Sequence, residues 1–127
     1  MKAVVLGRPF QIRVSGHMDL QYVEDVAEIF VRSALTPLEG AHVFNLEGAV
    51  VRMEDLVVEL DRLRPGAAGL ISVAWPKVPV AYRMDDSQLR AHIPGIPKTP
   101  LAEGMAKTLE IYERLRKEGR LSDTLGV

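Results

Sequence analysis

Cysteine is absent from this 127-residue sequence, which excludes disulfide bonds, zinc–thiolate sites and thiol catalysis. No apolar run approaches the roughly 20 residues that a membrane-spanning helix needs, so we expect no membrane partner. The short apolar stretch at the N-terminus is not followed by a small-residue cleavage site. We therefore expect no signal peptide and a cytoplasmic location.

The sequence also lacks an excess of charge of either sign, because it has 16 basic and 17 acidic residues and a formal net charge of -1. A near-neutral chain has no electrostatic reason to bind nucleic acid, and we expect none. The basic run "ERLRKEGR" at 113–120 is typical of the solvated last turns of a helix, where cations complement the helix dipole. The length suits a single domain over residues 1–127.

The apolar periodicity that is present predicts an α/β fold. Alternation over 10–15 and apolar runs over 41–46 and 69–75 predict short strands. Helical spacing of apolar residues predicts helices over 22–35, 53–63 and 101–115. Residues 15–21 read as a polar loop. We expect a small, partly parallel sheet with about four helices.

Local signals predict where two helices begin. Asp85 with Gln88 three residues later is a reciprocal capping pattern and predicts a short helix that starts at Asp85. Thr99 followed by Pro100 predicts a hydroxyl cap and a proline in the first helical position. Gly119 is expected to end that last helix.

Three stretches between Gly7 and Leu121 resemble one known family. They are "DLQYVEDVAEIFVRSAL", "GAHVFNLEGAVVRMEDLVVEL" and "DDSQLRAHIPGIPKTPLAEGMAKTLEIYERLRKEGRL". In this order and spacing they are similar to the C-terminal half of extended short-chain dehydrogenase/reductases, the NAD-dependent epimerases and dehydratases. The resemblance implies a substrate-binding lobe, with the Rossmann half and its NAD chemistry absent from the sequence.

The residues that such chemistry requires are not found. A glycine-rich phosphate loop would need a third glycine after Gly66 and Gly69, and Ser72 stands there instead. This stretch follows a helix, so we interpret it as a chain-reversal turn. The family's Tyr-x-x-x-Lys pair is missing too, because no tyrosine is followed four residues later by lysine. We expect no catalytic, cofactor-binding or metal residues, and NAD(P) only in a complete family member.

Two absences concern the substrate. Nucleotide-sugar members place a phosphate-binding arginine at the position that Met18 occupies here, and no arginine lies between Pro65 and Tyr82. The sequence therefore favours a small polyol or sugar acid, or no substrate at all, over a nucleotide sugar.

Five residues are candidates for substrate binding, each with a simpler alternative. His17 and Asp19 belong to the loop that faces substrate in relatives, although Asp19 in an exposed loop could merely help the helix start. Gln21 is placed to reach a substrate hydroxyl or to remain at the surface. Arg13, on the polar face of the first strand, suits a substrate carboxylate or solvent. Arg83 lines a cleft or stays solvated.

Other polar residues read as structural. Asp25 in the first turn of its helix suits the dipole, and Asn45 is expected to fix a turn. Asp85, Asp86 and His92 resemble a metal set, but capping explains them better. Trp75, the only tryptophan, is expected to act as a core residue, an interface lid or a surface that meets the absent domain.

Two functional hypotheses follow. In the first, the chain is the substrate-binding portion of an NAD-dependent epimerase/dehydratase-like oxidoreductase that acts on a sugar or sugar acid and is not catalytic alone. It would then be a truncated polypeptide, the product of a shortened gene, or the natural partner of a separate Rossmann subunit. In the second, it is a non-catalytic small-molecule-binding or self-associating module. Both predict a homo-oligomer or a Rossmann-domain partner.

Overall fold

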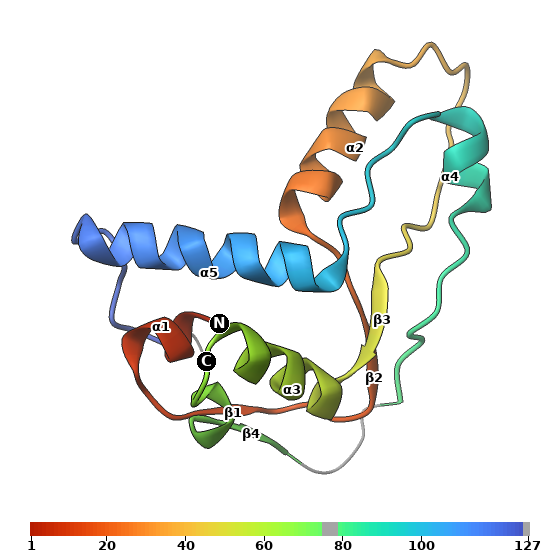
Figure 1. Cartoon of the computed structure of the whole chain (residues 1–127). Helices are drawn as coiled ribbons and strands as arrows, with labels where there is room; N and C mark the ends of the chain where they lie inside the picture. The colour runs from red at the N-terminus through yellow and green to blue at the C-terminus, as the bar shows by residue number, and fades with distance from the viewer. Residues whose placement is uncertain (75–78, 126–127) are drawn as a thin grey trace. The chain divides into compact units, whose positions relative to one another are not determined.

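Short strands alternate with helices along the chain in the computed structural model, which describes residues 1–74 and 79–125 (Figure 1). Trp75 lies outside the described residues. The elements, in chain order, are α1 Lys2–Leu6, β1 Phe10–Ile12, β2 His17–Leu20, α2 Val23–Leu35, β3 Ala49–Arg52, α3 Met53–Leu63, the 3-10 turn η1 Ala67–Gly69, β4 Ile71–Val73, α4 Ser87–His92 and α5 Leu101–Lys117.

The described strands form two small sheets. β1 pairs with β4 in parallel, with Phe10 opposite Ile71 and Ile12 opposite Val73. β2 pairs with β3. Parallel neighbours cannot be joined by a hairpin, and α3 lies within the connection from β1 to β4. The predicted α/β class with a small, partly parallel sheet is therefore confirmed, with five α-helices in the described part of the chain instead of about four.

Contacts divide the chain into two compact units. Unit 1 comprises Met1–Gly16, Arg52–Pro79 and Ala102–Val127, and unit 2 comprises His17–Val51 and Val80–Leu101. The expectation of a single domain over residues 1–127 stays a prediction.

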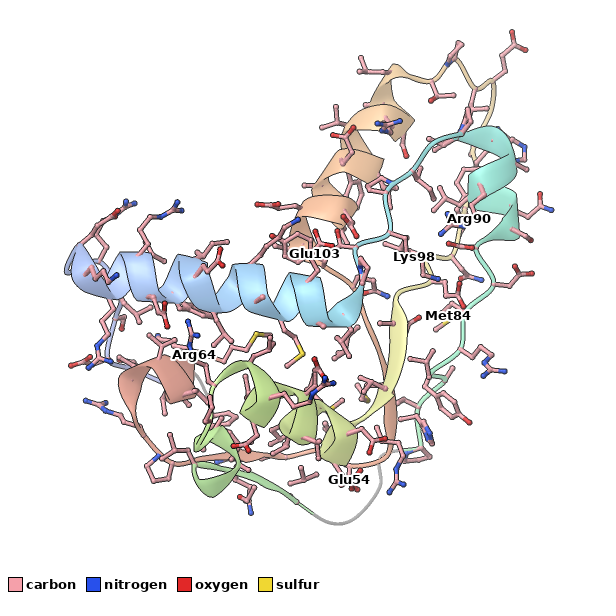
Figure 2. The ribbon with its side chains drawn as sticks, in the orientation of Figure 1. Glu54, Arg64, Met84, Arg90, Lys98 and Glu103 are labelled. Carbon is pink, nitrogen blue, oxygen red and sulfur yellow. The ribbon has the colours of Figure 1, made fainter. Side chains whose placement is uncertain are left out.

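Unit 1 is built around the β1–β4 pair and α3. Its buried apolar residues come from α1, α3, the 3-10 turn, β4 and α5: Ala3, Val5, Met53, Leu60, Ala67, Ile71, Met105 and Leu109. At the end of α3, Arg64 Nε donates to Glu113 Oε1 of α5 at 2.9 Å (Figure 2). Because both side chains are substantially exposed, this pair orients the helices more than it stabilises them.

Unit 2 has its own core between α2 and α4. The buried cluster contains Ile29, Leu89, Ile93 and Ile96, and Phe44 and Leu46 pack against it. On α4, Arg90 binds Asp86 through both carboxylate oxygens, at 2.9 and 2.6 Å. That hydrogen-bonded carboxylate raises the pKa of Arg90.

The three predicted long helices are confirmed, with small shifts where they begin. α5 begins at Leu101, one residue after the predicted proline position. α4 begins at Ser87, two residues after Asp85, and the expected reciprocal capping with Gln88 does not form. Instead Asp85 Oδ1 accepts the N–H of Ser87 at 2.9 Å, which also lowers the pKa of Asp85.

The predicted strand over 41–46 is wrong. This segment is extended but pairs with no described strand, and Ala41, His42 and Val43 are exposed. Phe44 and Leu46 face the unit 2 core while Asn45 faces solvent. The alternation therefore records burial on one side of an extended chain, which does not require hydrogen bonding to a neighbouring strand.

The predicted polar loop over 15–21 is also wrong in its centre, because His17–Leu20 forms β2. Its polar composition hid a strand whose partner, β3, begins at Ala49. Just before β3, the N–H of Gly48 donates to Asp19 Oδ1 at 2.7 Å. Gly48 lies so close to β2 that a Cβ atom would be 2.3 Å from the carbonyl oxygen of Leu20.

We predict that Gly48→Ala destabilises the protein by about 1 to 3 kcal/mol, because the new methyl group must displace backbone. Urea unfolding followed by circular dichroism measures this change. Gly69→Ala is the matched control, since a Cβ there meets nothing within 4 Å. Equal stability of the two variants would contradict the proposed close approach of Gly48 to β2.

Candidate functional site

β2 presents two of the candidate residues on the same side. His17 and Asp19 are two positions apart in the strand, so their side chains leave the same face, whereas Met18 leaves the other. Asp19 Oδ1 is held by the N–H of Gly48. Asp19 Oδ2 is buried and has no hydrogen-bond partner among the described residues. Asp19 therefore anchors the turn before β3, rather than starting α2 as its alternative role supposed.

The exposed end of this face carries an aromatic pair. The ring of His17 stacks on Tyr82, with 4.9 Å between centroids and an angle of 24° between planes. Tyr82 and its neighbour Arg83 belong to a described segment that is neither helix nor strand. Both Tyr82 and Arg83 are exposed. The stack thus brings two of the predicted site residues, His17 and Arg83, into one region of unit 2.

Gln21 and Asp25 lie beside a small cavity in unit 2. The cavity has a volume of about 20 Å³, enough for about one water molecule, and is bordered by the ends of β2 and α2, by 46–49 and by 97–99. Gln21 Nε2 donates to the Leu46 carbonyl at 3.4 Å. At the rim, Lys98 Nζ pairs with Glu47 Oε2 at 2.7 Å (Figure 2). A cavity of this size has no room for a sugar.

Asp25 has a structural role stronger than a dipole effect. Its Oδ2 accepts the backbone N–H of Thr99 at 2.5 Å, and its Oδ1 accepts the Thr99 hydroxyl at 2.8 Å. The two residues are 74 positions apart, so this clasp ties the start of α2 to the segment before α5. The Thr99 hydroxyl, expected to cap α5, is the donor in this contact.

The fifth candidate, Arg13, is exposed just after β1 and belongs to unit 1, while the other four belong to unit 2. The five-residue substrate set stays a prediction. Asp85, Asp86 and His92 engage Ser87, Arg90 and the Gln88 carbonyl respectively. Among residues 1–74 and 79–125, no three His, Asp or Glu side chains group as metal ligands.

The turn with Gly66 and Gly69 does not fit a dinucleotide phosphate. Asp61 Oδ1 accepts the N–H of Gly66 at 3.0 Å and that of Ala68 at 2.9 Å. A carboxylate therefore already holds the backbone donors that would face a phosphate, and its charge would repel one. The turn follows α3, as a chain reversal does.

Sequence reasoning missed Tyr82 and the partnership of Asp25 with Thr99. In the sequence Tyr82 has no lysine four residues later and no other distinguishing pattern, because aromatic stacking across 65 positions leaves no local signal. The clasp joins Asp25, which the helix dipole already explains, to Thr99, which the predicted cap of the last helix already explains. No signal in one sequence shows that the two motifs meet.

Comparisons with known proteins bear on the fold. No protein-family model matches this sequence, and no curated protein matches it. Solved structures do match. MoeE5 in complex with UDP-glucose and NAD is 22% identical with a TM-score of 0.73, and the match covers 91% of this chain and 40% of that one.

Two further structures agree. TunA, an NAD-dependent NDP-hexosamine 5,6-dehydratase involved in tunicamycin biosynthesis, has 20% identity and a TM-score of 0.71 over 89% of this chain and 38% of its own. UDP-glucuronic acid 4-epimerase from Bacillus cereus in complex with NAD has 18% identity and a TM-score of 0.70 over 90% and 37%. The chain shares the fold of part of these enzymes.

This likeness confirms the predicted resemblance at the level of the fold. The chain spans between 37% and 40% of the length of these three structures. Within the described residues, no helix combines the length and apolar character needed to cross a membrane.

We predict that Asp25→Ala lowers the free energy of unfolding by about 1.5 to 3 kcal/mol, because it removes two charge-assisted hydrogen bonds. Thr99→Val removes the hydroxyl but keeps the backbone donor, so its cost is smaller. Urea unfolding of both single variants and the double variant forms a double-mutant cycle. Glu24→Ala, in the same first turn, controls for the helix dipole. Strictly additive effects of Asp25→Ala and Thr99→Val would show that the hydroxyl contact contributes nothing, and unchanged stability of Asp25→Ala would contradict the whole clasp.

Proposed function

We propose that this chain is the substrate-binding portion of an NAD-dependent epimerase/dehydratase-like oxidoreductase that acts on a sugar or sugar acid. The supporting observation is the fold match, which takes in 91% of this chain but 40% of MoeE5. The complete enzyme would obtain its hydride chemistry from residues other than these, in the same polypeptide or in a Rossmann-domain partner. Alone, the 127 residues would bind substrate without converting it.

A residue of β2 supports a substrate without a nucleotide. The matched structures are named with UDP-glucuronic acid, UDP-glucose or an NDP-hexosamine. This chain has Met18 where the family pattern places a phosphate-binding arginine, and Met18 leaves β2 on the face opposite His17. A thioether cannot pair with a diphosphate. The proposed substrate is therefore a sugar or sugar acid without a nucleotide.

The cofactor of the complete enzyme would be NAD(P), supplied with its own binding loop. In this chain the turn after α3 is closed to phosphate by Asp61. We accordingly assign neither cofactor binding nor a catalytic role to any of these residues. Their part in the reaction would be to hold and orient the substrate and to exclude water from it.

We expect the isolated chain to bind D-glucuronate in the millimolar range and not to bind NAD. Chemical shifts of the amide groups report the first, and the melting temperature together with Trp75 fluorescence reports the second. Addition of a Rossmann-domain partner protein should produce an NAD response. An NAD response from the chain alone would contradict the proposed division of labour, and absence of D-glucuronate binding would contradict the sugar-acid assignment.

A second candidate function, a self-associating interaction module, is favoured by α2. One side of this helix leaves Phe30 72% and Leu35 79% exposed, with Val23 and Val31 also exposed. Beside it runs a largely apolar groove of about 530 Å³, bordered by α2, 36–46 and α4. Contiguous apolar surface of this kind is typical of interaction sites. We propose that a second copy or a Rossmann-domain partner covers it.

Phe30→Glu should convert a self-associated wild-type chain to monomer. Burial of a phenylalanine side chain is worth about 1.5 to 3 kcal/mol, so the dissociation constant should rise roughly 10- to 100-fold. Light scattering coupled to size-exclusion chromatography at micromolar concentrations measures this. Val58→Glu, at a position 61% exposed on α3, is the control. A wild-type chain that is monomeric at every concentration would rule out self-association.

A further inference from the structure

The His17–Tyr82 stack is the starting point for a more specific assignment. Its rings are nearly parallel and in contact, and Tyr82 remains 41% exposed. His17 is exposed as well. The pair therefore forms an aromatic surface that is partly open to solvent. An apolar surface of this kind can receive the C–H face of a sugar ring, which is the flat, weakly polar side of a pyranose.

Arg83, the next residue after Tyr82, is a cation without a polar partner among the described residues. Unit 2 contains three arginines, and two of them are ion-paired: Arg32 with Glu28 at 2.7 Å, and Arg90 with Asp86 at 2.6 Å. Arg83 is exposed, and no hydrogen bond or ion pair holds it within the described part of the chain. A free guanidinium presents a planar fork of donors that matches a carboxylate.

We propose that His17, Tyr82 and Arg83 form a receptor for the carboxylate-bearing end of a sugar acid. The sugar ring lies on the His17–Tyr82 stack and Arg83 binds the carboxylate through two parallel hydrogen bonds. This inference rests on the proposed function and deepens it, because it names the residues that would distinguish a sugar acid from a neutral sugar. It places the ring and the charge of the substrate on separate, adjacent side chains.

The division of labour separates this proposal from a purely structural stack. If the stack serves only to attach the segment around Tyr82 to β2, its residues affect stability and no ligand. If the receptor exists, Arg83 affects only the acidic ligand, while Tyr82 affects acidic and neutral sugars alike. Arg83 is exposed and makes no hydrogen bond or ion pair with any described residue, so its replacement should leave the fold intact.

The experiment titrates the whole chain with D-glucuronate and, separately, with D-glucose, and follows the backbone amide shifts. Arg83→Ala should weaken D-glucuronate binding about tenfold, the loss expected for a charge-assisted pair, and change D-glucose binding less than twofold. Arg83→Lys should lie between Arg83→Ala and the wild type. Tyr82→Ala should weaken both ligands, and Tyr82→Phe, which keeps the ring, should weaken neither. Arg62→Ala, an exposed arginine of α3 in unit 1, controls for net charge.

The outcomes separate the two levels of the proposal. D-glucuronate binding that survives Arg83→Ala unchanged would overturn the receptor while leaving the proposed function standing. An equal loss in Arg62→Ala would reduce the effect to net charge and overturn it as well. Absence of binding by the wild type would overturn the proposed function and the receptor together. Unchanged amide spectra of the variants without ligand confirm that each remains folded.

Discussion

The clasp between Asp25 and Thr99 is the contact on which the arrangement of unit 2 depends. A single carboxylate accepts both donors of one residue from a segment 74 positions away. Few other polar contacts join the first and second stretches of this unit, whose core of Ile29, Leu89 and Ile93 is small. Because apolar packing is not directional, the clasp fixes which part of the later segment meets the start of α2.

The sequence predicted the features that repeat within one element and missed those that join distant ones. The apolar stripes of α2, α3 and α5 are local and were found. The 41–46 segment was misread because one-sided burial of Phe44 and Leu46 imitates a strand. The sequence does not predict β2 because His17 and Asp19 are polar. Their contacts, with Tyr82 and with the N–H of Gly48, come from distant parts of the chain. The candidate substrate-binding residues stay a prediction, and the aromatic surface of His17 and Tyr82 depends on a contact between residues 65 positions apart.

The two units differ in whether a carboxylate already binds their N–H donors. In unit 1, Asp61 occupies the backbone donors of the turn at Gly66, which makes that turn complete without a ligand. In unit 2, Arg83 pairs with no carboxylate of the described residues and follows Tyr82, a member of the partly exposed aromatic pair, in the sequence. A carboxylate therefore already occupies the glycine-containing turn, whereas the proposed substrate would supply the carboxylate for Arg83. Both features favour a substrate-side role over a cofactor-side role.

The apolar side of α2 ties the stability of this protein to its surroundings. This helix buries Ile29 on one side and exposes Phe30 and Leu35 on the other. Exposure of these apolar side chains to water is unfavourable, and a binding partner that buried them would remove that cost. By mass action, whatever binds that side in the folded state alone also opposes unfolding. Under the proposed association, the melting temperature would therefore rise with the concentration of the chain or of its partner.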